Sequence, residues 1–162
     1  MVKDVHVQSR AGEVTKSLRI HHLLCIPLFV GEGYSGGFSR NMAAVIRTLK
    51  DNADQPLAAA AGPDMICRGC PNLEEDGICV NSRLIKETSV HGNDKSLLCG
   101  VDKKDMELAK HVGITPGCSY TFREMMEMAR EKVTKEIFEE SCGNCQWYLR
   151  GLCSYEKWSD AF

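Results

Sequence analysis

The stretch LRIHHLLCIPLFV (Leu18–Val30) decides how the chain begins to fold. It is apolar, and it predicts a strand that continues into a short helix. Pro27 limits how far a regular helix can extend upstream, because its ring clashes with the preceding turn. The same stretch carries His21, His22 and Cys25. Histidine and cysteine commonly bind metals, so the segment is also a candidate source of ligands.

A glycine-rich segment, GEGYSGGFS (residues 31–39), follows and leads into a longer helix. Apolar residues of RNMAAVIRTLKDN recur at helical spacing, and Ser39 is the predicted N-cap. The glycine segment matches neither of the common phosphate-binding motifs, so we interpret its glycines as packing against a cluster or against the neighbouring helix. The short apolar segment PLAAAAG (residues 56–62) predicts a buried strand, with a helical turn as the alternative.

Helices dominate the second half of the chain. One is predicted over Asp102–His111, closed by Gly113. The segment TFREMMEMAREKV opens with a capping box, in which Thr121 is followed by Glu124 three residues later. A further short helix, TKEIFEE (residues 134–140), leads towards the C-terminal cysteines.

The length and charge of the chain limit its class. With 162 residues, it is long enough for one compact domain with a substantial core. The elements predict a mainly helical α+β fold over residues 18–162, with a small sheet and two cysteine-rich metal-binding loops, after a flexible leader over residues 1–17. A net charge of −2 offers no electrostatic footprint for nucleic acid. The longest apolar stretch is about half a membrane span, and the N-terminus lacks the apolar core of a secretory signal. We therefore expect a cytoplasmic protein that binds neither nucleic acid nor membrane.

Two segments share an unusual cysteine pattern: CRGCPNLEEDGIC, the first module (Cys67–Cys79), and CGNCQWYLRGLC, the second module (Cys142–Cys153). Each module reads C-x-x-C and ends in a third cysteine that is preceded, two residues earlier, by glycine. Glycine lets the backbone turn sharply, so each module can fold three sulfurs towards one centre. In a reducing compartment clustered thiols bind metal or perform redox chemistry more often than they form disulfides, and nine cysteines cannot all pair internally. The candidate metal ligands are Cys67, Cys70, Cys79, Cys142, Cys145 and Cys153.

Each module offers three ligands, whereas a tetrahedral metal ion or a 4Fe–4S cluster takes four. Cys25 is the natural fourth ligand, and His21 and His22 are alternatives. Cys99 and Cys118 stand alone in the sequence, and we interpret them as small buried hydrophobic residues.

Iron–sulfur and zinc are the two cofactors that suit these thiols. A zinc ion on Cys67, Cys70, Cys142 and Cys145 would leave the third cysteine of each module without a role. Three-cysteine modules with aliphatic or aromatic shielding, such as Trp147, fit iron–sulfur better. We therefore expect one or two 4Fe–4S clusters, with zinc as the alternative.

The motifs LRIHHLLC, GEGYSGGF, CRGCP and CGNCQW…GLC occur in an order that resembles the prokaryotic domain of unknown function 1284 family. The resemblance covers Leu18–Cys153. Members of that family are small bacterial and archaeal proteins for which the cysteines suggest iron–sulfur binding. The resemblance implies that Cys25 belongs with both modules as one functional set, but it implies no particular activity.

The sequence favours electron transfer, or redox support of a partner enzyme, as the function, with a redox protein as the partner. One alternative is an enzyme that uses the open-coordination iron of a three-cysteine cluster. The other is a zinc-stabilised binding module. A pocket that reaches the cluster and is lined by His21 or His22 would favour the enzyme over the carrier.

Overall fold

The chain enters the fold through a short strand that turns directly into a helix. The structure is a computed structural model, and it describes residues 16–79 and 100–161. Strand β1 (Ser17–Arg19) leads to helix α1 (His22–Cys25) and to a 3₁₀ turn, η1 (Ile26–Leu28), as predicted. Pro27 lies in the first turn of η1, where its missing N–H costs nothing. His21 and His22 therefore lie at the junction between the strand and the helix.

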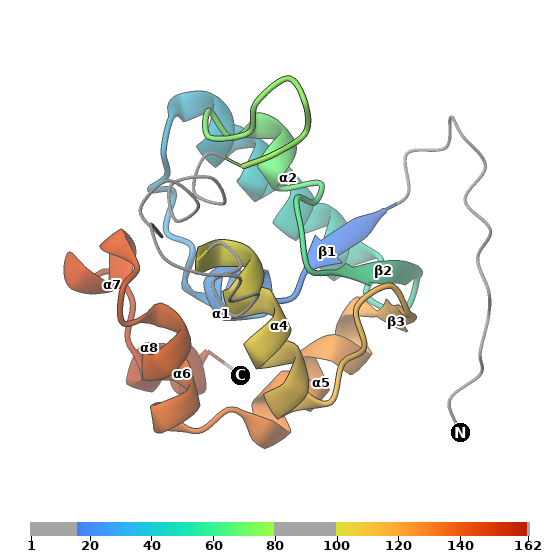
Figure 1. Cartoon of the computed structure of the whole chain (residues 1–162), viewed down its shortest axis with the longest axis vertical. Helices are drawn as coiled ribbons and strands as arrows, with labels where there is room; N and C mark the ends of the chain where they lie inside the picture. Colours follow the sequence, from blue (N-terminus) through green and yellow to red (C-terminus); the bar gives the residue numbers. More distant parts are fainter. Residues whose placement is uncertain (1–15, 80–99, 162) are drawn as a thin grey trace, which may run out of the picture.

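A three-stranded sheet forms one side of the molecule (Figure 1). Strand β2 (Pro56–Ala60) is the predicted apolar strand, and it lies between β1 and β3 (Ser119–Thr121). β1 runs parallel to β2, and β3 runs antiparallel to it. The register aligns Leu18 with Ala59 and Leu57 with Tyr120. Because β1 and β2 are parallel, the residues that follow them, including His21 and Asp64, meet at the same edge of the sheet.

Helix α2 (Gly36–Asp51) connects the first two strands and begins earlier than the sequence predicted. Its N-cap is Ser35, whose Oγ accepts a hydrogen bond from the Phe38 N–H at 3.0 Å. The prediction of Ser39 as the cap was wrong, because the two glycines before Phe38 join the helix. A Cβ on Gly33 would lie 2.4 Å from the Phe38 ring. The glycine segment is thus packed against its helix, as we interpreted it.

The C-terminal half is helical, with bounds close to those predicted. The helices are α4 (Gly100–Val112), α5 (Phe122–Lys132), α6 (Lys135–Cys142), α7 (Gln146–Leu149) and α8 (Tyr155–Asp160). Gly113 ends α4 with a φ of 77°, and the capping box of Thr121 and Glu124 is present in full. The second module is less irregular than expected, because Cys142 is the last residue of α6 and α7 lies within the module.

One apolar core joins the sheet to the helices. Leu18, Leu23, Leu108, Met125 and Phe138 are fully buried and come from five different elements. The Trp158 indole N–H donates to the carbonyl of Leu23 at 3.2 Å, so α8 is fixed against α1. The seven α-helices and one small sheet of the described residues confirm a mainly helical α+β fold. In the ranges that the structure describes, no helix has both the length and the apolar character needed to cross a membrane.

Candidate metal centre

A cleft of about 850 Å³ opens beside α1, α4 and the second module. Most of the sulfur and imidazole groups singled out in the sequence reach it. The residues that line it include Cys25, Cys142, Cys145, Cys153, His21 and His22. Cys25 therefore lies in the same cleft as the three cysteines of the second module, and four thiols line one cavity.

The four thiols are close enough to affect one another electrostatically. Burial raises the pKa of Cys25 well above its usual value, and the neighbouring thiols Cys142 and Cys145 raise it further. Burial also raises the pKa of Cys142 to about 12, against an opposing effect of Lys104. A buried group of like-charged thiolates is unfavourable alone, but a bound cation reverses this and keeps the sulfurs deprotonated. Without a bound cation, the Cys25 and Cys142 thiols are therefore protonated at neutral pH.

Glycines shape the second module as the sequence predicted. The Cys145 N–H donates to the Cys142 carbonyl at 2.8 Å, which closes the C-x-x-C turn. A Cβ on Gly143 would lie 2.6 Å from the carbonyl oxygen of Glu139, so only glycine fits at this point. Gly151 has a φ of 77°, a conformation that returns the chain towards the cleft two residues before Cys153.

The first module is built in a similar way but is packed against a different helix. The Cys70 N–H donates to the Cys67 carbonyl at 2.9 Å, and Gly77 has a φ of 78°. A Cβ on Gly69 would lie 2.6 Å from the Cβ of Asn41 in α2. Cys79 pairs with Leu73 in an isolated antiparallel bridge, which closes the loop.

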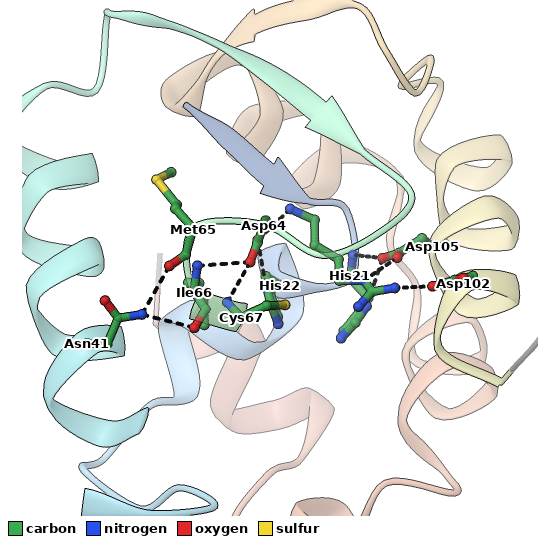
Figure 2. A network of polar contacts seen from close by, with 10 residues as sticks. His21, His22, Asn41, Asp64, Met65, Ile66, Cys67, Asp102 and Asp105 are labelled. Atoms are coloured by element: carbon green, nitrogen blue, oxygen red, sulfur yellow. Dashed lines mark hydrogen bonds and ion pairs between the residues drawn. The ribbon is translucent and has the colours of Figure 1, made fainter. Parts of the chain in front are cut away.

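Helix α2 also anchors the segment that leads into the first module. The Asn41 side-chain amide donates to the carbonyls of Met65 and Ile66, both at 3.0 Å (Figure 2). This contact fixes the backbone immediately before Cys67. Cys67 and Cys79 are both buried, at 9% and 8% exposure.

Two buried aspartates orient the two histidines (Figure 2). His22 Nδ1 lies 2.8 Å from Asp64 Oδ2, and His21 Nδ1 lies 2.7 Å from Asp105 Oδ1. A carboxylate accepts hydrogen bonds, so the Nδ1 of each ring is the donor. Burial lowers the pKa of His21 to about 4 despite the opposing charge of Asp105. His21 is therefore neutral at physiological pH, with a basic nitrogen left for the cleft.

Arg19, the last residue of β1, holds both aspartates in place. Its guanidinium Nε donates to Asp105 Oδ2 at 2.5 Å, and its terminal nitrogen donates to Asp102. Its backbone N–H donates to Asp64 Oδ2 at 2.6 Å. Burial alone lowers the pKa of Arg19, but the paired aspartates raise it above its usual value, so the guanidinium is charged.

Sequence reasoning missed these three charged residues, Arg19, Asp64 and Asp105. Asp64 stands three residues before Cys67, and this spacing could have suggested a cap for the turn that carries the cysteine. Asp105 and Arg19 carry no local signal, because they meet only when α4 packs against the end of β1.

Tyr34 lies between the two modules. Its ring centroid is 5.3 Å from that of Trp147 and 5.2 Å from that of Phe38. Burial raises the pKa of Tyr34 to about 12, and the thiols that add to this are Cys145 and, more weakly, Cys25 and Cys70. Tyr34 and Trp147 both line the cleft, so aromatic rings shield the second module.

The structure distributes the predicted ligands unevenly. Cys25, His21 and His22 lie with the second module at the cleft, and His22 is also close to Cys67 of the first module and to Asp64. The two C-x-x-C pairs do not share one wall of this cavity, since its lining includes Cys142 and Cys145 but no cysteine of the first module. Cys118 is partly buried and is not among the lining residues, and Cys99 lies outside the described residues.

The chain belongs to a family of unknown function. A family model described as protein of unknown function (DUF1284) matches residues 33–151, which is more than half of the chain. The resemblance read from the glycine and cysteine motifs is therefore confirmed at the level of the family. Comparison with curated proteins and with solved structures returned no match.

Proposed function

We propose that this chain is an iron–sulfur protein that holds a 4Fe–4S cluster on Cys25, Cys142, Cys145 and Cys153. The observation that carries the proposal is the position of Cys25. This residue of α1 lines the same cleft as the three cysteines of the second module, so the cleft has four thiols. Four thiolates are the usual ligand set of such a cluster. When bound, the cluster supplies one-electron redox chemistry, and the chain's residues position and shield it.

The spread of the four sulfurs supports a cluster rather than a single ion. A tetrahedral zinc site places its sulfurs about 3.8 Å apart, since each Zn–S bond is about 2.3 Å. These four sulfurs are not all within 4.8 Å of one another; in the part of the chain that the structure describes, only His22, Asp64 and Cys67 form such a group. A cluster binds each cysteine on a different iron and so suits a wider arrangement.

Electron transfer is the role that suits a cluster with four cysteine ligands. A full set of thiolates leaves no open iron for a substrate, so the chain would exchange electrons with a redox protein partner. Val30 lines the cleft, and Leu149 belongs to the second module. The two residues are 70% and 71% exposed. Exposed aliphatic side chains beside a redox centre suit a transient partner. A reducing cytoplasm would keep the thiols available for the cluster.

A redox enzyme is the second candidate, and the cleft itself favours it. Both histidines line a cavity that reaches the four thiols, which is the arrangement expected of an enzyme rather than a carrier. His21 offers a neutral Nε2, and Lys104 adds a positive charge at the same cavity. Such a cavity would hold a small molecule next to the cluster. His21→Gln separates the two roles, because it would impair turnover by an enzyme but leave electron exchange with an artificial acceptor unchanged.

The proposal is tested by replacing Cys25, the proposed ligand that is far from the second module in the sequence. The full chain is purified anaerobically as wild type, Cys25→Ser and Cys118→Ser, and absorption is recorded at about 400 nm, where thiolate-to-iron charge transfer appears. We expect the wild type and Cys118→Ser to absorb and to give a paramagnetic signal after reduction, and Cys25→Ser to lose most of both. Equal absorption in all three proteins, or none in the wild type, would contradict the proposal.

A further inference from the structure

Helix α4 contributes a positively charged side chain to the cleft that holds the four thiols. Lys104 lines this cleft together with the cysteines proposed as cluster ligands. Its charge reaches them, because it lowers the pKa of Cys25 and of Cys142 against the larger effect of burial. It also lowers the pKa of His21. The Lys104 ammonium is therefore close to groups from two distant segments, α1 and the second module.

Buried contacts fix the part of α4 that carries Lys104. The next residue, Asp105, has a fully buried side chain. Its Oδ1 accepts the His21 backbone N–H at 2.9 Å, and its Oδ2 accepts the Arg19 Nε–H at 2.5 Å (Figure 2). Val101, which lies one turn before Lys104 on the same face of the helix, also lines the cleft. The fold therefore determines which face of α4 forms this wall.

Lys104 differs from the other charged residues of this wall in having no partner of opposite charge among the residues that the structure describes. Lys103 Nζ lies 3.6 Å from Glu107 Oε1, and Glu140 Oε2 lies 3.5 Å from His111 Nε2. Lys104 is partly buried and makes no such pair within those residues. A charge that is partly removed from water is unfavourable unless an opposite charge lies nearby. We therefore expect a negatively charged group beside Lys104.

A cluster bound by four thiolates would supply this negative charge. The charge becomes more negative when the cluster accepts an electron, so a nearby cation stabilises the reduced cluster more than the oxidised one. Net charge in and around a cluster is one of the features that set its reduction potential. A lysine at this place would therefore raise the potential.

We propose that Lys104 raises the reduction potential of a cluster on Cys25, Cys142, Cys145 and Cys153 by holding its ammonium group beside the cluster. This inference rests on the proposed function and deepens it, because it names a residue that regulates the redox chemistry of the same site. Lys104 acts through its charge and not as a ligand, since the four thiolates already bind the four irons.

The test is an anaerobic redox titration of the full chain with dithionite and mediators, followed at about 400 nm. Lys104→Met removes the charge but keeps an unbranched side chain. We expect it to shift the reduction equilibrium about tenfold towards the oxidised cluster, which lowers the potential of a one-electron couple by about 59 mV. Lys104→Gln, a second neutral variant, should give the same shift. Lys104→Arg keeps the charge and should stay within about twofold of the wild type.

Lys103→Met is the matched control. It removes one positive charge from the same cleft, but the Lys103 side chain is 49% exposed and is paired with Glu107. Solvent and the neighbouring carboxylate screen its charge, so the equilibrium should change by less than about twofold. A shift as large as that of Lys104→Met would overturn the proposal, because any lysine of the cleft would then have the same effect.

Iron and acid-labile sulfide are measured in every protein before the titration, so that loss of the cluster is distinguished from a change in its potential. Equal potentials in the wild type and Lys104→Met, with the cluster intact in both, would overturn the role of Lys104 and leave the proposed function standing. A wild type without iron and sulfide would overturn the proposed function, and the role of Lys104 with it.

Discussion

The first and third cysteines of the first module are buried, whereas the cysteines of the second module are partly buried and line the cleft. Both follow the same C-x-x-C pattern, and both use a glycine with positive φ two residues before the third cysteine. Their surroundings differ: Cys67 lies beside His22 and the carboxylate of Asp64, while Cys142 shares a cavity with Cys25 and Lys104. The comparison teaches that two modules with the same local pattern acquire different neighbours, because those neighbours come from distant parts of the chain.

The largest expected effect is a loss of the cluster from changes in one module alone. Cys142→Ser with Cys145→Ser should remove iron and sulfide. Cys67→Ser with Cys70→Ser should keep both, because no cysteine of the first module lines the cleft. The measurement is iron and sulfide content after anaerobic purification, and loss of iron from both variants would break the comparison.

The next largest effect concerns the buried charges behind the cleft. Asp105→Ala would leave the Arg19 guanidinium buried with only Asp102 beside it. Removing one partner of a buried pair is strongly destabilising, and we expect a loss of about 3 kcal/mol in the free energy of unfolding. The measurement is denaturant unfolding of the metal-free chain.

The control for Asp105→Ala is the exposed pair of Asp54 and Arg123, whose Nε and Oδ1 atoms are 2.7 Å apart. Asp54→Ala should leave the unfolding midpoint unchanged, because exposed ion pairs contribute little. Equal midpoints for the two variants would contradict the structural role given to Asp105.

A smaller effect is expected from the glycines inside the C-x-x-C turns. Gly69→Ala and Gly143→Ala each place a Cβ 2.6 Å from another atom, and we expect each to cost about 1–3 kcal/mol of stability. Gly62→Ala is the matched control, since nothing lies within 4 Å of its Cβ. Thermal unfolding of the three variants checks this, and a Gly143→Ala protein as stable as Gly62→Ala would show that the turn is looser than described.

The same glycine variants also sharpen the comparison between the modules. Gly143→Ala should weaken retention of the cluster, whereas Gly69→Ala should not, because Gly69 belongs to the first module. Iron measured after dialysis against a chelator would show whether the second module alone holds the cluster.

The sequence predicted those features that depend on a few neighbouring residues. The capping box of Thr121 and the end of α4 at Gly113 were correct because both are set within one helical turn. The predicted start of α2 was wrong, because Ser35 and Ser39 are both suitable N-cap residues. The packing of Phe38 against Gly33 favours Ser35.

The candidate site was predictable only in part. The cysteines and histidines were recognisable from their spacing, and the two modules have the glycine geometry expected of them. Which module Cys25 joins depends on how α1 packs against distant elements such as α8, and no local pattern predicts that. Asp64 and Asp105 could not be assigned for the same reason, because each meets its histidine only across the fold.

Iron, zinc and acid-labile sulfide per chain, measured on the anaerobically purified full-length protein, test the difference between the modules most directly. The account predicts about four irons and about four sulfides. Zinc without sulfide would contradict the cluster at the second module, and about eight irons would contradict the difference between the two modules.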